Sequence, residues 1–233
     1  MKETEMKTYT VGEIVASDYR AAKIFKEAGI DFCCGGKKTL EETCAAKGID
    51  PDALWNRLEN LGSEPSSANH NFNEWEPGFL CDYIVNVHHV FVRNTLPELM
   101  FYTNKIAKVH GENHPELYEV ADLFSQVNNE LAPHLTKEEN ILFPAVKEFH
   151  KSGSEKSASV IKNEMENISA EHESAGAAMD KINFLTDGYS VPEDACNSYR
   201  LALTMLEKFE DDLHTHVHLE NNILFPKTLE KIN

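Results

Sequence analysis

The sequence predicts an all-α protein, with a small helical domain at the N-terminus and an up-down bundle of four long helices after it. Apolar residues recur at helical spacing in four long segments, and no segment shows the alternation typical of a strand. Residues 62–76 are rich in Ser, Asn, Gly and Pro and have no apolar period, which indicates a linker. We therefore expect an N-terminal domain at 1–61, a linker at 62–76 and the bundle at 77–233.

Helix-capping signals mark the starts of short helices in the N-terminal domain. Thr10 with Glu13, and Thr39 with Glu42, have the spacing of a capping box, in which each side chain bonds the backbone N–H of the other residue. Pro51 is suited to the first turn of a further helix, because its missing N–H would have no partner there. These signals predict a chain of small helices.

Four longer segments carry apolar stripes of helical period, and the short connections between them favour an up-down bundle. Pro133 lies within the second stripe. We expect it to kink that helix or split it in two, because proline cannot donate the helical hydrogen bond. The four expected helices span about 78–108, 115–149, 155–185 and 192–231.

The overall composition excludes several classes of protein. The net charge is -17, from 39 acidic and 22 basic residues, and such a surface repels nucleic acid and anionic lipid. No run approaches the roughly 18 apolar residues of a membrane span. Five cysteines, an odd number at uneven spacings, argue against a secreted disulfide framework. Because the start also lacks the apolar stretch of a secretory signal, we expect a cytoplasmic protein.

The pattern H-x-x-x-E-x-N-I-L-F-P occurs twice, as HLTKEENILFP and HVHLENNILFP. It places His134 with Glu138, and His216 with Glu220, one helical turn apart on the same face. Each pair continues an apolar stripe, so both should point into the bundle core, where an unpaired carboxylate is costly. The alternative is a duplicated helix whose repeated face only packs.

The other two long helices each offer an inward histidine. His172 lies on the apolar face of the third helix. On the first helix the choice is between His88 and His89, and His89 fits the register of the duplicated helix pair better. His214 and His218 are also four residues apart, but they fall with acidic residues on the polar face of their helix, and we expect them to be solvated.

These six side chains predict a metal centre. Six ligands exceed what one tetrahedral zinc ion takes, and imidazole with bridging carboxylate suits two iron ions, with manganese as the rival. Glu138 and Glu220 could each bridge both ions, with two histidines per ion and open positions for an oxo or hydroxo bridge and a small ligand. The alternative is a structural bundle that binds no metal. The expected ligands are His89, His134, Glu138, His172, His216 and Glu220.

A pair of adjacent cysteines, Cys33 and Cys34, lies in a glycine-flanked loop. Adjacent cysteines are poorly spaced for a disulfide, so we expect two free thiols on an exposed loop near Lys37 and Lys38, suited to thiolate chemistry. They could hold iron in transit, exchange with a partner's thiol or react with nitric oxide. The alternative is a buried turn with unreactive cysteines.

The histidine motifs, with EHESAG around His172 and HHVFVRNTLPEL aligned on His89, resemble those of hemerythrin-like domains. Together with AGIDFCCGG in an N-terminal helical unit, they resemble the iron-sulfur cluster repair di-iron proteins, the RIC group. This resemblance implies cytoplasmic repair of iron-sulfur proteins damaged by nitrosative or oxidative stress, through transient contacts. A di-iron site would supply iron or process nitric oxide, which is a possible redox activity.

One departure separates the chain from oxygen-carrying hemerythrins, which place two histidines four residues apart on the third helix. Here Gly176 stands four residues after His172. The more symmetric site of four histidines and two glutamates is less suited to reversible oxygen storage. A hemerythrin-like sensor or carrier of oxygen or nitric oxide is the alternative function.

Overall fold

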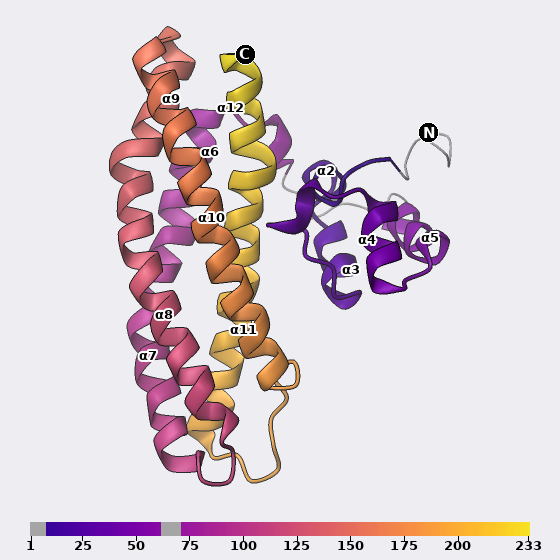
Figure 1. Ribbon diagram of the computed structural model, residues 1–233, viewed down its shortest axis with the longest axis vertical. Helices are drawn as coiled ribbons and strands as arrows, with labels where there is room; N and C mark the ends of the chain where they lie inside the picture. The colour runs from indigo at the N-terminus through magenta and orange to yellow at the C-terminus, as the bar shows by residue number, and fades with distance from the viewer. Residues whose placement is uncertain (1–7, 62–70) are drawn as a thin grey trace. The chain divides into compact units, whose positions relative to one another are not determined.

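The computed structural model describes residues 8–61 and 71–233, and its contacts divide the chain into two compact units. One unit holds Met1–Leu80 together with Val217–Asn233, and the other holds Cys81–His216. Within the described ranges the chain is helical and contains no strand (Figure 1), so the predicted all-α class is confirmed. Most of the expected linker, residues 62–70, lies outside the described residues.

The first unit begins with short helices that start where the capping signals predicted. Thr10 with Glu13, and Thr39 with Glu42, both form complete capping boxes. An isolated antiparallel bridge joins Thr10 to Thr39, so the two helix starts lie side by side. The elements are α2 (Val11–Ser17), α3 (Ala21–Glu27), the 3-10 turn η1 (Gly35–Lys37), α4 (Leu40–Lys47), α5 (Pro51–Leu61) and the 3-10 turn η2 (Phe72–Glu74).

The C-terminal end of the chain belongs to this first unit. Its π-helical segment η5 (Leu219–Leu224) packs against α2, η1 and η2, and α12 (Phe225–Ile232) follows it directly. Phe25, Leu40 and Phe225 are among its buried side chains. The chain therefore returns to its own N-terminal helices at its end.

The second unit contains the long helices of the bundle, and in Figure 1 successive long helices run in opposite directions. The second helix has a C-terminal extension beyond its π-helical segment, and the fourth begins later than the expected residue 192. The first residues of α6 and the last two of α11 are assigned to the first unit. The elements along this part of the chain are α6 (Pro77–Tyr83), η3 (Ile84–His89), α7 (Val90–His110), α8 (Glu116–Lys137), η4 (Glu138–Leu142), α9 (Phe143–Ser152), α10 (Glu155–Leu185) and α11 (Asn197–His218).

Pro133 does not split its helix, contrary to one of the two expected outcomes. Helix α8 continues past it to Lys137. Leu131 and Leu135, on either side of the proline, are both buried in the core. Their packing offsets the loss of one backbone hydrogen bond, which is the cost of proline at this position.

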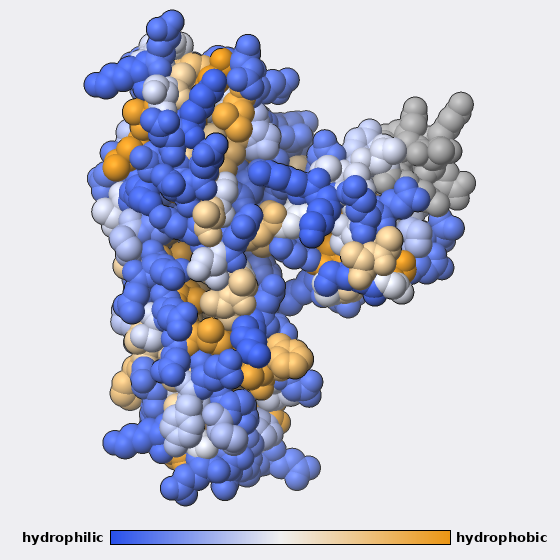
Figure 2. Space-filling model, in the orientation of Figure 1, coloured by the Kyte–Doolittle hydropathy of each residue, from blue (hydrophilic) through white to orange (hydrophobic). Residues whose placement is uncertain are grey.

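Aromatic and aliphatic side chains fill the bundle between α7, α8, α10 and α11. The Phe209 ring lies 5.4 Å from Phe124 and 6.4 Å from Phe91, measured between ring centroids. Hydrophilic residues cover most of the face seen in Figure 2. In the described part of the chain, every helix is too short or too polar to cross a bilayer.

Candidate metal centre

Three π-helical segments interrupt the long helices at the residues expected to bind metal. His89 ends η3, Glu138 begins η4, and Glu220 lies in η5. A π-turn adds a residue to the helical turn and rotates the side chains that follow, and such turns are frequent at functional sites. His134 and His172 lie on regular turns of α8 and α10.

The four histidines expected to bind metal meet in two pairs in the core of the second unit. The Nε2 atoms of His89 and His216 lie 3.2 Å apart, and those of His134 and His172 lie 3.1 Å apart. All four side chains are buried. Each pair thus brings two imidazole nitrogens from different helices to one point.

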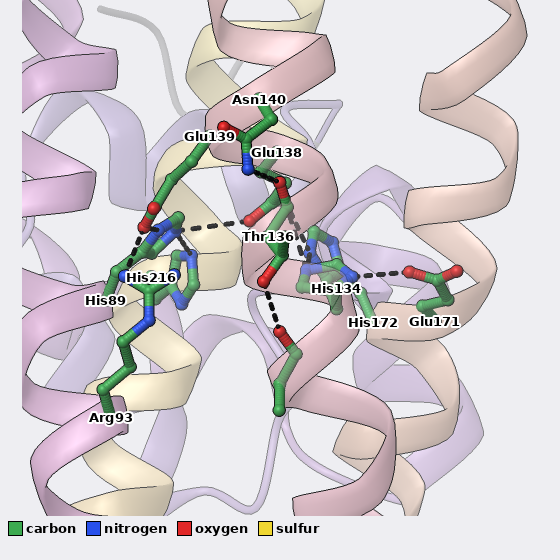
Figure 3. A network of polar contacts seen from close by, with 11 residues as sticks. His89, Arg93, His134, Thr136, Glu138, Glu139, Asn140, Glu171, His172 and His216 are labelled. Atoms are coloured by element: carbon green, nitrogen blue, oxygen red, sulfur yellow. Dashed lines mark hydrogen bonds and ion pairs between the residues drawn. The ribbon is translucent and has the colours of Figure 1, made fainter.

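Glu138 lies between the two pairs and directs one carboxylate oxygen toward each (Figure 3). Its Oε2 atom is 3.3 Å from Nε2 of His89, while its Oε1 atom is 3.2 Å from Nε2 of His134 and 3.8 Å from Nε2 of His172. The carboxylate is fully buried. This is the arrangement of a bridging ligand.

A carboxylate outside the centre orients His89. Oε1 of Glu139 is 2.7 Å from Nδ1 of His89 and accepts a hydrogen bond from Nη1 of Arg93 at 2.6 Å. Partial burial raises the pKa of Glu139, but the hydrogen bonds from Arg93 and His89 outweigh it and hold that pKa below its usual value. Glu139 therefore stays ionised and accepts the Nδ1 proton of His89.

The second pair has an equivalent support. Nδ1 of His134 lies 2.6 Å from Oε2 of Glu171, and Lys137 donates to Oε1 of Glu171 at 2.5 Å. Burial again raises the pKa of Glu171, and the bonds from Lys137 and His134 lower it overall. At metal sites, a carboxylate that accepts the proton of the other ring nitrogen fixes the tautomer and the orientation of a ligating histidine.

The combined donor set fits a cation. With a proton held on Nδ1 of His89 and of His134, the Nε2 lone pair of each ring faces inward, toward a second imidazole and a carboxylate oxygen. Lone pairs brought this close in a buried site repel one another unless a positive charge lies between them. The donor atoms of His89, Glu138 and His216 lie within 4.8 Å of one another, and so do those of His134, Glu138 and His172.

The structure also places the remaining candidates. Glu220 is fully buried and follows His216 by one turn of a continuous helical run, so the two side chains share a helix face. His88 is buried but points elsewhere, with its Nδ1 atom 3.0 Å from Oδ1 of Asp212. The residue that approaches His216 and Glu138 is therefore His89.

The cysteine pair is not on an exposed loop, contrary to the expectation. Cys33 is 4% exposed, its thiol donates to Oδ1 of Asp31 at 3.1 Å, and its sulfur lies 3.8 Å from that of Cys34. The hydrogen bond with Cys34, burial and the negative charge of Asp31 raise the pKa of Cys33 well above its usual value. Both cysteines are free thiols, and Cys33 is protonated at neutral pH.

Segment η5 holds this loop within the first unit. The side-chain amide of Asn222 donates to the backbone oxygens of Phe32 (3.2 Å) and Cys33 (2.9 Å). His218 packs between Tyr19 and Phe32 and is fully buried, so the expectation that it is solvated was wrong. Burial lowers the pKa of His218 to about 4.

Sequence reasoning did not single out the residues that support these sites. Glu139 and Glu171 each stand directly beside an expected ligand in the chain, and this adjacency was the available signal. For Asn222 the signal was its place in the repeated motif. Nothing local linked it to a loop 189 residues away.

Two family models match the chain. The model described as ScdA_N, a domain of unknown function, matches residues 7–62. The model described as the hemerythrin HHE cation binding domain matches residues 82–228, which confirms the hemerythrin-like resemblance and supports a cation site in this segment.

Curated relatives match over nearly the whole chain. The iron-sulfur cluster repair protein YtfE of Pectobacterium atrosepticum is 35% identical over 223 residues, which cover 94% of this chain and 96% of that protein. The protein of the same name from Yersinia pestis is 35% identical over 228 residues, covering 97% and 98% of the two chains.

Proposed function

The chain belongs to the family of the iron-sulfur cluster repair protein YtfE, and we propose that it repairs iron-sulfur clusters with a di-iron centre in its hemerythrin domain. The clients are iron-sulfur proteins damaged by nitrosative or oxidative stress, met transiently. The repair consists of iron donation, nitric oxide processing or both. The observation that carries this proposal is the position of Glu138 between two histidine pairs.

The proposed ligands divide into two sets around Glu138. His89 and His216 would hold one ion with Oε2 of Glu138, and His134 and His172 would hold the other with Oε1. Glu220 is proposed as the second carboxylate, because it is buried and shares a helix face with His216.

Iron is proposed as the metal, with manganese as the rival. Imidazole suits iron, copper, nickel and zinc, and carboxylates suit harder ions such as manganese, so a set that mixes both donor types is compatible with iron. When bound, the iron pair supplies a one-electron redox couple and a source of iron. Buried cores exclude bulk water, and the Glu139 and Glu171 carboxylates keep two imidazoles correctly oriented.

The cysteine pair is proposed to act in the same process as a thiol site. Its loop is hydrogen-bonded to η5, the segment that carries Glu220. Because Cys33 is buried and protonated, the half-buried Cys34 is the thiol that a partner or nitric oxide would meet first. Free thiols also support a reducing compartment, and we propose the cytoplasm.

The test combines metal content, spectrum and repair. Full-length protein purified without added metal should contain two irons per chain, with the absorption of a bridged pair. It should restore activity to a nitric-oxide-treated [4Fe–4S] enzyme. Glu138→Gln should lose both the spectrum and the repair, whereas Glu148→Gln, the same change at an exposed residue of α9, should keep both.

Other outcomes would separate the parts of the proposal. Zinc in place of iron would refute the di-iron centre. Iron bound at full stoichiometry, together with reversible binding of nitric oxide or oxygen and no repair, would refute cluster repair and support a sensor or carrier.

A further inference from the structure

A fifth buried histidine, His88, lies beside the proposed metal centre but is not one of its ligands. It precedes His89 on the π-helical segment η3, and both side chains are buried. Consecutive residues of a regular helix point about 100° apart, whereas the wider turn of a π-helix changes which side chains face inward. His88 and its two neighbours on α11, Asp212 and His216, all belong to the second unit.

One hydrogen bond holds the ring of His88. Its Nδ1 atom lies 3.0 Å from Oδ1 of Asp212. In the part of the chain that the structure describes, its Nε2 atom is buried without a hydrogen-bond partner. A buried polar atom without a partner costs free energy, and a leucine at this position would avoid that cost. Core packing alone therefore does not account for a histidine here.

The ring of His88 lies face to face with the ring of His216, a proposed metal ligand. The two ring centroids are 5.7 Å apart and the ring planes differ by only 10°, which is the geometry of an offset stack. Asp212 and His216 are one turn apart and share a face of α11. The hydrogen bond to Asp212 therefore holds the ring of His88 beside that of His216.

A parallel ring can orient a ligand histidine as a carboxylate does. The χ2 torsion of histidine has broad minima, so a neighbouring group must fix the plane of the ring. Glu139 fixes the ring of His89 through its Nδ1 atom. For His216, rotation about χ2 would drive the edge of its ring into the face of His88. The stack thus keeps Nε2 of His216 directed at Nε2 of His89, 3.2 Å away.

We propose that His88, held by Asp212, is a positioning residue that fixes the ring plane of His216 and so controls how firmly the adjacent metal ion is retained. This inference rests on the proposed di-iron centre and deepens it, because it assigns the retention of one ion to a residue that does not bind metal. The ion between His89 and His216 depends on the stack. The ion at the other histidine pair does not, so the two ions differ in how readily the protein can donate them.

Two substitutions of His88 test the role of the ring. Full-length protein, as purified with its own metal, is titrated with a chelator, and the absorption spectrum and the content of every first-row metal are measured. His88→Leu removes the flat ring and should weaken the binding of one ion about tenfold, with the other held as in wild type. His88→Phe keeps a flat ring and should hold both ions almost as wild type does.

A matched pair of aspartate variants tests the support of His88. Asp212→Ala removes the acceptor of the His88 hydrogen bond and should weaken the same ion. Asp211→Ala makes the same change of charge at the adjacent exposed carboxylate and should weaken neither ion. Because Asp212 is only partly buried, its variant tests the proposal even where His88→Leu does not fold.

The outcomes separate this inference from the proposed function. The positioning role is overturned if His88→Leu holds both ions as tightly as wild type, if it weakens both ions equally, or if His88→Phe behaves as His88→Leu does. Selective loss of one ion from protein that contains zinc or manganese would support the positioning role and refute the di-iron centre. Wild-type protein without any metal would refute the centre and this inference with it.

Discussion

Replacing Glu139 with glutamine should release one of the two proposed iron ions more readily than the other. Glu139 binds no metal itself in the proposed centre, but it accepts the Nδ1 proton of His89 at 2.7 Å. Glutamine keeps the size and one acceptor oxygen of glutamate and removes the charge. The other pair has its own carboxylate, Glu171, and is left intact.

The size of the effect follows from this one hydrogen bond. Bonds to a charged group contribute about 1.5–3 kcal/mol, and the Glu139 side chain is 23% exposed, so solvent screening is limited. Arg93 shares the same carboxylate oxygen, which favours the lower half of that range. At about 1.4 kcal/mol per factor of ten, metal affinity at the His89 pair should fall about tenfold to thirtyfold.

Competition with a chelator measures this affinity. In Glu139→Gln, iron release should become biphasic, with one equivalent lost early and one retained as in wild type. Arg93→Gln is the matched control, because it leaves the bond between Glu139 and His89 in place and should change affinity by less than about threefold. Equal affinities for Glu139→Gln and Arg93→Gln would refute a role for the carboxylate in orienting the ligand.

Three further predictions concern the pH response, the cysteine loop and a surface thiol. The buried His218 has a pKa of about 4, against 6.5 when exposed, so between pH 6.5 and 4 only the unfolded chain gains this proton. The free energy of unfolding should therefore fall by up to about 3 kcal/mol over this pH range. In urea unfolding, His218→Phe should lack this contribution to the loss of stability. In Gly36→Ala the added Cβ would lie 2.5 Å from Oδ1 of Asn222, which should displace that amide from the cysteine loop. The free energy of unfolding should fall by about 1–3 kcal/mol, and the cysteine pair should react faster with a thiol reagent. Cys196 is exposed, and His110 at 3.1 Å lowers its pKa, so mass spectrometry should find it alkylated before the other cysteines, and His110→Gln should slow it.

Local signals predicted much of the fold. The capping boxes at Thr10 and Thr39 were visible because a capping box involves residues only three apart. The third long helix, expected at about 155–185 from its apolar period, coincides with α10 (Glu155–Leu185). The π-helical segments were not predicted, because an apolar stripe identifies a helix but does not show at which residue one turn widens.

By itself, the sequence determined which side chains share a helix face. His134 with Glu138, and His216 with Glu220, are one turn apart in any helix, and the apolar stripes around them point both pairs to the core. Tertiary structure decided which faces meet: the pairing of His89 with His216, the place of Glu138 between two histidine pairs, and the burial of Cys33 and His218. Helical spacing is a property of consecutive residues, whereas burial and long-range partners depend on how separate helices pack, and no local pattern encodes that.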